Sequence, residues 1–551
     1  MTGAEAVVRA LESLGVEVAF GLPGVHNLAL WRALDGSRIR LVGVRHEQAA
    51  AYAADGYARS AGRLGVALTT TGPGAANTLG AVGEAWASRS PILVIATDIP
   101  TTVRRPGVWR GALHEASDQG AMFAPVVKHV GRVASAEGLG EAVVRAAAEA
   151  LAAPARPAYL EVPTNLLSAP AGDGLAAPTA PPAGALPEEA RLAEAVELVA
   201  RAARPLVWAG GGAVGAGAAV AQLAERLAAP VITTYAARGL LAPDHPCLVA
   251  APPHVPEAGA LWDEADLVLA VGSDLDGMMT QGWAMPAPPR LVAINVDGAD
   301  AAKAYPPDVL IEADAREAVA ALAGRLEQRG GLEELAARLA ALDAAVRSGL
   351  EASDPEPLAF LDAVAGALPT DAVLVCDMCI PGYWLGGFHT PPAPRRMLYP
   401  LGWGTLGCGF PQAIGAALAG TGPAVSVSGD GGFLYASGEL ATAAQERMPL
   451  TAVIVDDGGY GMLRYDQELR GDPHVGVDLH TPDFEAMAAS FGVRAEAVEG
   501  LGADFGTALA RHVALDEPSV LVARAALRPP PNVSPRWYRR AVAGDQSQSR
   551  R

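Results

Sequence analysis

The hydrophobic residues of this chain are arranged in short runs that alternate with segments of helical periodicity. In the first part of the chain, four such runs indicate buried strands, at Val18–Phe20, Ile39–Val44, Val66–Thr71 and Pro91–Ala96. The segment Glu47–Arg59 between two of them has the pattern of a helix. Strand, turn and helix that repeat at this spacing predict a parallel sheet covered by helices.

Two further blocks repeat this pattern. A stretch rich in Ala, Pro and Gly, from Ser168 to about Pro187, predicts a linker after the first block. The strands expected in the later blocks are Arg204–Ala209, Asp266–Val271, Leu291–Asp297, Ala372–Asp377, Ala424–Ser428 and Thr451–Val455. We therefore expect an α/β fold with three consecutive doubly wound parallel-sheet domains, at residues 1–167, 188–326 and 355–528. Residues 529–551 are expected to form a flexible tail.

Composition narrows the classes of function. A length of 551 residues with 51% hydrophobic residues suits several buried cores. The net charge of −19, without a long basic run, argues against nucleic acid as a partner. Neither a signal peptide nor a membrane span is expected, which favours a cytoplasmic protein. Cys376 and Cys379 form a CxxC without a second pair, so reduced thiols are expected rather than a zinc site.

Two acidic turns in the third block carry the strongest chemical signal. Strand Ala424–Ser428 runs into Gly429-Asp430-Gly431-Gly432, and strand Thr451–Val455 runs into Asp456-Asp457-Gly458-Gly459. A strand–helix–strand unit of this length places both turns at the carboxyl edge of a parallel sheet, where ligands bind in open α/β sheets. Two carboxylates at that edge suit a magnesium ion shared with a phosphate, which the glycines allow to approach closely.

This pattern resembles the thiamine diphosphate signature of the acetolactate synthase, pyruvate decarboxylase and benzaldehyde lyase superfamily. The usual Asn-Asn pair is Asp456-Asp457 here. The resemblance implies that magnesium is bound by Asp430, Asp457 and the backbone carbonyl of Gly459. It also implies that the cofactor contacts neighbouring residues, namely Gly431, Gly432, Tyr460, Gly461 and Met462.

The first block resembles the same superfamily in the segment Arg45-His46-Glu47-Gln48, which is followed by Gly56-Tyr57-Ala58-Arg59. The resemblance assigns to Glu47 a hydrogen bond to the aminopyrimidine ring of the cofactor. That bond stabilises the imino tautomer, which takes the proton from the thiazolium carbon. Glu47 is therefore expected to be both a catalytic and a cofactor-binding residue.

Two more segments extend the resemblance. Thr71–Asn77 resembles the turn that lies against the cofactor, through Pro73 and Asn77. Leu401–Gly407 resembles the segment that bends the cofactor, with the Gly404 carbonyl accepting from its 4′-amino group and Leu406 between its two rings. Because Glu47 and Asp430 must contact opposite ends of one cofactor, the resemblance implies a homodimer or homotetramer with sites between subunits.

The residues expected at the substrate end depart from both pyruvate decarboxylase and acetolactate synthase. His26 and His114 are expected to be catalytic, since two histidines beside the reacting carbon can relay protons near neutral pH. Substrate contacts are expected from Val25, His26, His114, Glu115, Leu463 and Asp466. Leu463 stands where pyruvate decarboxylase has a glutamate, Asp466 where acetolactate synthase has a tryptophan, and Ile380-Pro381 where the latter has Gln-His. The loops 22–27 and 113–115 most resemble the guanidino-oxopentanoate decarboxylase branch.

The glycine-rich turn Gly210–Gly215 of the second block resembles the place where synthases bind FAD, but FAD is not the favoured expectation here.

We expect a 2-oxo acid decarboxylase that acts through an ylide and an enamine. The close alternative is a carboligase that uses the same enamine on a second carbonyl. A non-catalytic cofactor-binding relative is disfavoured by the presence of Glu47. An FAD- or NAD-dependent oxidoreductase is disfavoured by the metal motif.

Overall fold

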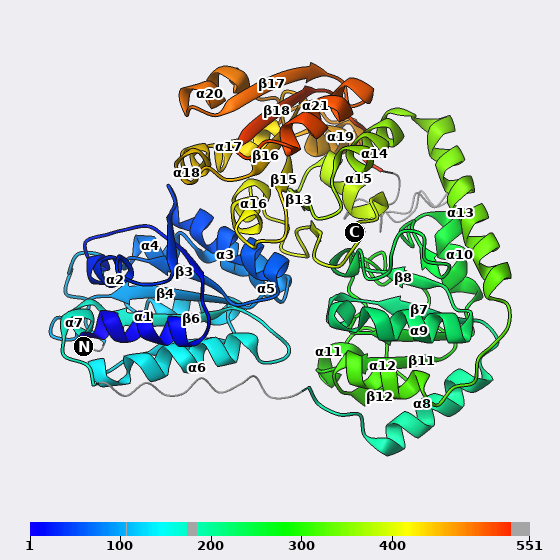
Figure 1. Ribbon diagram of the computed structural model, residues 1–551, viewed down its shortest axis with the longest axis horizontal. Helices are drawn as coiled ribbons and strands as arrows, with labels where there is room; N and C mark the ends of the chain where they lie inside the picture. Colours follow the sequence, from blue (N-terminus) through cyan, green and yellow to red (C-terminus); the bar gives the residue numbers. More distant parts are fainter. Residues whose placement is uncertain (106, 173–183, 531–551) are drawn as a thin grey trace. The chain divides into compact units, whose positions relative to one another are not determined.

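The computed structural model describes residues 1–105, 107–172 and 184–530 (Figure 1). Within these ranges, three sheets form, each a 6-stranded parallel sheet flanked by helices. The chain divides into two compact units. The first joins Met1–Ala183 to Glu356–Gly382 and Pro391–Leu527, and thus holds the first and third sheets. The second holds the middle sheet, in Gly184–Pro355, together with Tyr383–Thr390.

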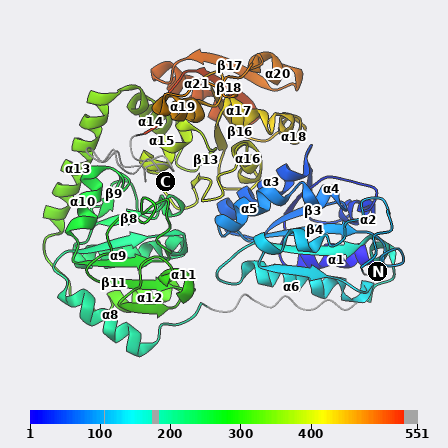
Figure 2. The same ribbon diagram turned by 180° about the vertical axis from the view of Figure 1, so that it is seen from behind.

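The first sheet has the strand order β2-β1-β3-β4-β6-β5. Its strands are β1 (Val18–Gly21), β2 (Arg40–Gly43), β3 (Gly65–Thr69), β4 (Ile92–Asp98), β5 (His129–Arg132) and β6 (Ala158–Pro163). One face packs on α1 (Gly3–Ser13), α2 (Leu28–Leu34), α6 (Leu139–Leu151) and α7 (Thr164–Ser168), and the other on α3 (Glu47–Ala61) and α5 (Leu79–Ala87). Figure 2 shows the same layers from behind. Between β3 and α5, the chain forms the short helix α4 (Pro73–Ala76).

The ends of α1 and α3 follow from their sequences. At the start of α1, Thr2 and Glu5 form a capping box, in which each side chain accepts the backbone N–H of the other residue. At the start of α3, the His46 ring accepts the N–H of Gln48. The same helix ends at Gly62, whose φ of 68° is the left-handed conformation that glycine adopts without strain.

The third sheet repeats the topology of the first, in the order β14-β13-β15-β16-β18-β17. Its strands are β13 (Val373–Cys376), β14 (Met397–Leu398), β15 (Ala424–Gly429), β16 (Leu450–Asp456), β17 (Arg494–Glu499) and β18 (Ser519–Arg524). Its helices are α14 (Glu356–Ala367), α15 (Ile380–Phe388), α16 (Gly409–Ala417), α17 (Asp430–Leu434), α18 (Leu440–Glu446), α19 (Gly461–Arg470), α20 (Phe484–Ser490) and α21 (Ala503–Val513). In both sheets the strand order reverses beside the first strand, which is where ligands bind in such folds.

Helices α3 and α16 join these two sheets into one unit. A Cβ added at Gly56 would lie 1.9 Å from the Gln412 carbonyl oxygen, and one at Gly415 would lie 1.9 Å from the Ala53 carbonyl oxygen. The two helices therefore cross at a distance that only glycine permits. Beside the crossing, Gln412 Nε2 donates to the buried Asp55 carboxylate over 2.7 Å. A single apolar core runs through both domains at this contact.

The middle sheet has the order β12-β11-β10-β7-β8-β9, which is the Rossmann order viewed from its far edge. Its strands are β7 (Pro205–Ala209), β8 (Val231–Thr233), β9 (Leu248–Val249), β10 (Leu267–Val271), β11 (Leu291–Asn295) and β12 (Val309–Glu312). Its helices are α8 (Glu189–Arg201), α9 (Gly217–Leu227), α10 (Pro256–Glu264), α11 (Gly298–Ala302), α12 (Ala315–Ala323) and α13 (Leu332–Ser353). A Cβ at Gly272 would lie 2.4 Å from the carbonyl carbon of Gly212, so backbone packing alone accounts for glycine at these two positions.

The expected α/β class with three consecutive parallel-sheet domains is confirmed. Most of the expected linker and nearly all of the expected tail lie outside the described residues. Among the helices that the structure describes, none is long and apolar enough to cross a membrane.

Candidate active site

The two acidic turns of the third domain lie side by side, as the sequence predicts. Strands β15 and β16 are parallel neighbours, with Gly429 opposite Val455, so Asp430 and Asp457 follow adjacent strand ends. The Asp430 side chain is fully buried, and neither of its oxygens has a hydrogen-bond partner among the described residues. Burial raises the pKa of Asp430 to about 7, and the charges of Asp457 and Asp456 add to this rise. A buried carboxylate with free oxygens fits a divalent cation.

The second carboxylate of this pair already has a cationic partner. Arg464 Nη2, on α19, donates to Asp457 Oδ1 over 2.6 Å and to the Asp457 carbonyl oxygen over 2.7 Å. Burial raises the pKa of Asp457, and the charge of Arg464 opposes that rise. Arg464 thereby offsets the negative charge that Asp457 adds relative to the amide usual in this motif. We did not expect this partner from the sequence, although its position one helical turn into α19 was a signal.

The loop that carries the expected Gly459 carbonyl is fixed by its neighbours. Tyr460 donates its backbone N–H to the Val477 carbonyl over 2.8 Å, and Gly459 pairs with Asp478 in an isolated bridge. A Cβ at Gly461 would lie 2.2 Å from Asp457 Oδ2, and one at Gly431 would lie 2.6 Å from the Tyr460 ring. Glycine is therefore needed at both positions to keep the two turns together. Gly432 is buried and Met462 is half-buried beside them.

The segment with Gly404 and Leu406 is held by a carboxylate that the sequence reasoning did not single out. Asp377 follows β13 and is 1% exposed. Its carboxylate accepts from the backbone N–H groups of Met378, Gly407 and Gly409 and from the Ser428 hydroxyl. Gly404 and Gly407 both have left-handed φ angles, of 72° and 79°. The signal that could have identified Asp377 is its position at the carboxyl end of a buried strand.

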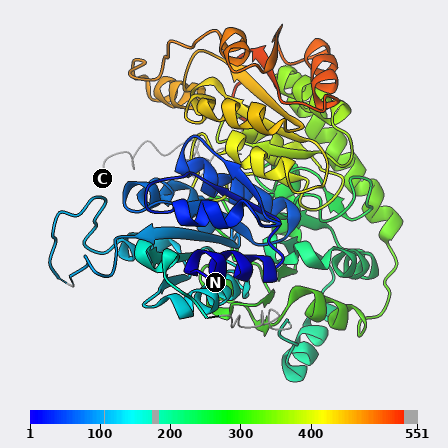
Figure 3. The same cartoon turned by 60° about the vertical axis from the view of Figure 1, so that its left-hand side comes forward.

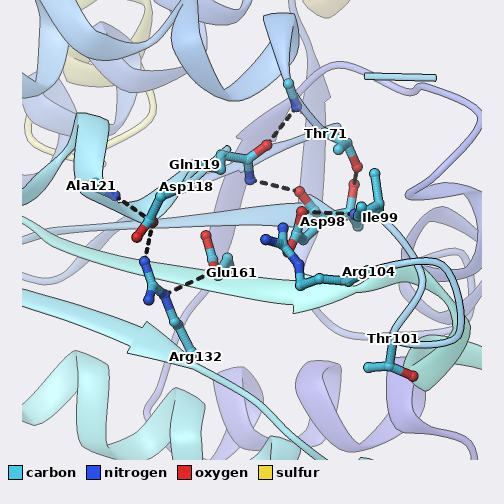
Figure 4. A network of polar contacts seen from close by, with 12 residues as sticks. Thr71, Asp98, Ile99, Thr101, Arg104, Asp118, Gln119, Ala121, Arg132 and Glu161 are labelled. Atoms are coloured by element: carbon cyan, nitrogen blue, oxygen red, sulfur yellow. Dashed lines mark hydrogen bonds and ion pairs between the residues drawn. The ribbon is translucent and has the colours of Figure 1, made fainter. Parts of the chain in front are cut away.

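In the first domain, Glu47 is the first residue of α3 and is 8% exposed. Asn77 Nδ2, just after α4, donates to Glu47 Oε2 over 3.0 Å. Pro73 opens α4 and so fixes the approach of Asn77. The turn before it is anchored by the buried Gln119, whose Oε1 accepts the Gly72 N–H over 2.6 Å (Figure 4). The structure therefore brings Glu47 together with the turn that the sequence assigned to the cofactor.

The two expected histidines face each other. The rings of His26 and His114 meet edge to face, with centroids 5.2 Å apart. In each ring, Nδ1 is buried and has no hydrogen-bond partner among the described residues. Burial lowers the pKa of His26, and His114 lowers it further, while the charge of Asp98 opposes the change. Each ring therefore retains a nitrogen that a polar group of a bound molecule can satisfy.

The remaining substrate residues differ in their surroundings. Glu115 Oε2 accepts the backbone N–H groups of Arg110 and Ala112, so this carboxylate shapes its own loop. Val25 is 64% exposed and Leu463 is 41% exposed. Asp466 is half-buried on α19, three residues beyond Leu463. The two exposed apolar side chains, Val25 and Leu463, have no polar group that could bind the histidines.

Three family models match the chain in the order of its sheets. They are the N-terminal binding domain of thiamine pyrophosphate enzymes at residues 1–122, the central domain at 192–322 and the C-terminal binding domain at 380–523. The chain belongs to the thiamine pyrophosphate enzyme family.

Among its relatives is a probable 2-ketoarginine decarboxylase of Pseudomonas aeruginosa, which is 40% identical over 89% of this chain and 88% of its own length. A probable acetolactate synthase large subunit of Methanocaldococcus jannaschii is 30% identical over 90% of this chain and 88% of its own length. An acetolactate synthase of Mycobacterium bovis is 31% identical over 89% of this chain and 83% of its own length. The chain is thus an enzyme that uses thiamine diphosphate, with a decarboxylase and carboligases among its relatives.

Proposed function

We propose that this enzyme decarboxylates a 2-oxo acid whose side chain ends in a guanidinium group, with thiamine diphosphate and Mg²⁺ as cofactors. The observation that carries this proposal is that the chain is more similar to a 2-ketoarginine decarboxylase than to the acetolactate synthases. Over nearly the same share of the chain, identity is 40% to the 2-ketoarginine decarboxylase and 30% or 31% to the acetolactate synthases. 2-Ketoarginine is the 2-oxo acid of arginine, so it carries a guanidinium.

The third domain supplies the groups for Mg²⁺ and the diphosphate. The unpartnered oxygens of Asp430, the Asp457 carboxylate and the Gly459 carbonyl are the ligands that this hard cation prefers. Arg464 reduces the net negative charge that the diphosphate meets at this edge. Asp377 fixes the segment of Gly404 and Leu406 that faces the rings of the cofactor in this proposal.

When bound, thiamine diphosphate supplies an acidic carbon that adds to the 2-oxo group and accepts electrons as carbon dioxide leaves. Glu47 holds a proton at the aminopyrimidine, and Asn77 keeps the Glu47 carboxylate in place. His26 and His114 then bind the substrate carboxyl end and move the proton that the product needs.

The proposal includes assembly and location. Glu47 and Asp430 belong to domains with equivalent topology, and one cofactor needs a residue of each kind. We propose that a second copy of the chain supplies one of the two, in a homodimer or homotetramer in the cytoplasm.

The acetolactate synthases among the relatives support carboligation as a second candidate function. One experiment separates the two. The enzyme with both cofactors is incubated with 2-ketoarginine, with pyruvate and with both, and carbon dioxide and product masses are measured. We expect carbon dioxide and a guanidino aldehyde from 2-ketoarginine alone. A ligated product as the main species would favour the carboligase, and no turnover of any 2-oxo acid would refute both.

A further inference from the structure

A cluster of charged side chains lies at the carboxyl edge of the first sheet, beyond the residues assigned above (Figure 4). Asp98 is the last residue of β4, and Glu161 lies on the neighbouring strand β6, opposite Ala96. Arg132 ends β5 on the other side of β6, where it pairs with Glu161 in the strand register. Asp98 is 2% exposed and Glu161 is 5% exposed, so both carboxylates are inside the protein.

Both carboxylate oxygens of Asp98 have partners. Asp98 Oδ1 accepts the backbone N–H of Ile99 over 2.8 Å, and Oδ2 accepts from the guanidinium of Arg104. Arg104 belongs to the long connection between β4 and β5, which projects from the first domain (Figure 3). Asp98 thus binds a guanidinium that comes from the loop side of the sheet edge.

The partners of Glu161 leave one oxygen unused. Arg132 Nε contacts Glu161 Oε1 over 3.1 Å, and the other end of the same guanidinium contacts Asp118 at the surface. Glu161 Oε2 is buried and has no hydrogen-bond partner among the described residues. A buried carboxylate oxygen without a donor is costly unless a ligand supplies one.

The charges of the cluster do not balance. Asp98, Asp118 and Glu161 are three carboxylates, whereas Arg104 and Arg132 are two guanidiniums. Burial raises the pKa of Glu161 to about 7, and Asp98 raises it further although Arg132 and Arg104 act in the opposite direction. A cation bound at Glu161 Oε2 would supply the donor that this oxygen lacks and would favour the ionised form of the carboxylate.

The cluster also lies within electrostatic reach of the histidine pair. The charge of Asp98 acts on His26 and raises the pKa of that ring against the effect of burial. Thr164 directly follows β6. Its hydroxyl donates to the His26 carbonyl over 2.6 Å and so joins the end of β6 to the loop that carries His26. The end group of a 2-oxo acid held at His26 is thus within range of the charge of Asp98.

We propose that Glu161, supported by the charge of Asp98, binds the cationic end group of the substrate and so selects 2-oxo acids that carry a guanidinium. A guanidinium can donate to Glu161 Oε2 while its charge lies near the carboxylate of Asp98. Both oxygens of Asp98 already have partners, in Ile99 and Arg104, so Asp98 contributes its charge while Glu161 Oε2 supplies the free acceptor. This inference rests on the proposed function, because it specifies the substrate of the same site.

The test compares Asp98→Asn and Glu161→Gln with the parent enzyme, each with both cofactors, on 2-ketoarginine and on the uncharged 2-oxohexanoate. We expect kcat/KM for 2-ketoarginine to fall by at least about 30-fold in each variant, mainly through KM, because a buried charge loses its partner. For 2-oxohexanoate we expect a change within about threefold. The control is Glu141→Gln, an exposed carboxylate on α6 that is not part of this cluster.

Equal losses on both acids would show a merely structural role and overturn the inference, as would an unchanged KM for 2-ketoarginine. Melting temperatures of all variants identify a folding defect. If the parent enzyme releases no carbon dioxide, the proposed function fails. The affinity of the cofactor-loaded enzyme for the two acids then still tests the inference. Calorimetric titration of both acids into cofactor-loaded Glu47→Gln, with and without Asp98→Asn, should show a preference for 2-ketoarginine that Asp98→Asn removes. Absence of that preference in Glu47→Gln would overturn the inference.

Discussion

Asp377 accepts the backbone N–H of Gly407 through both oxygens of its carboxylate, over 3.0 and 3.1 Å. The carboxylate is buried at the end of β13, and the N–H of Met378 donates to the same group over 2.7 Å. Burial raises the pKa of Asp377, while the N–H groups that it accepts oppose the rise. One carboxylate thereby joins the strand end to the left-handed turn that follows Leu406.

Asp377→Asn should loosen this turn and weaken cofactor binding. The amide retains one acceptor oxygen but presents an NH₂ group to backbone donors, which leaves at least one N–H unpaired. We expect the dissociation constant for thiamine diphosphate, measured by calorimetry with saturating Mg²⁺, to rise at least about tenfold. Asp371→Asn, at an exposed position before the same strand, should leave the constant unchanged. Equal affinity of Asp377→Asn and the parent enzyme would contradict this role.

Asp430→Asn should weaken metal binding more than it weakens the fold. The change removes the charge of a buried carboxylate whose oxygens have no partner among the described residues. We expect the Mg²⁺ concentration for half-maximal cofactor binding to rise about 10- to 100-fold. The melting temperature without metal should not fall, because removal of a buried charge relieves desolvation. Asp472→Asn, on an exposed loop, is the control, and an unchanged Mg²⁺ requirement in Asp430→Asn would refute the metal site.

Glu47→Gln should separate catalysis from binding. The amide has nearly the same shape and can still accept the hydrogen bond from Asn77, but it does not hold the proton as a carboxyl group does. We expect kcat for carbon dioxide release to fall about 10²- to 10⁴-fold. Affinity for thiamine diphosphate should change by less than about tenfold. Glu12→Gln, on α1, should match the parent enzyme in both measurements, whereas a fully active Glu47→Gln would exclude this role.

His254 makes the middle domain sensitive to acid. Its ring Nε2 donates to the carbonyl oxygens of Met278 and Met279, each over 3.1 Å, and the side chain is 3% exposed. Burial lowers the pKa of His254 to about 4, and Arg238 lowers it further against these hydrogen bonds. In the unfolded chain the pKa is about 6.5, so between these values the unfolded state binds a proton that the folded state does not.

The contribution of His254 to stability is therefore complete above pH 6.5 and is lost as the pH falls toward 4. We expect the free energy of unfolding, from urea titrations, to decrease over this range in the parent protein. His254→Gln should be less stable at pH 7 but should depend less steeply on pH. His480→Gln, in an exposed segment, should keep the slope of the parent protein. An identical slope in His254→Gln would show that other groups govern the acid response.

The glycine crossing of α3 and α16 gives a direct test of packing. Gly56→Ala places a methyl group against the Gln412 carbonyl, so the helices must separate. We expect a loss of at least about 2 kcal/mol in the free energy of unfolding. Gly366→Ala, on α14 with nothing near its Cβ, should raise stability by about 0.5–1 kcal/mol. Equal stability of the two variants would show that the crossing adapts at little cost.

The features that the sequence predicted best are those with short-range causes. Strands β15 and β16 and the turns at Asp430 and Asp457 follow from local hydrophobic runs and glycines, and the structure places them side by side. The helix that begins at Glu47 was predicted from its periodicity and starts at that residue.

The features that we missed depend on contacts between distant segments. The bond from Asp377 to Gly407 and the contact of Gly56 with Gln412 join parts of the chain that no local pattern relates. The charged cluster was missed for the same reason, since Asp98, Arg104, Glu161 and Arg132 come from three strands and a loop. Seen alone in the sequence, none of these residues differs from an ordinary surface or core residue.

The glycine crossing also joins two parts of the candidate site within one chain. Helix α3 begins with Glu47, and α16 begins at Gly409, whose N–H donates to Asp377. The two helices meet backbone to backbone at Gly56 and Gly415, so direct contact fixes the spacing between the Glu47 end and the Asp377 end. If each cofactor takes its two ends from different copies, this rigid joint lies between two reaction centres.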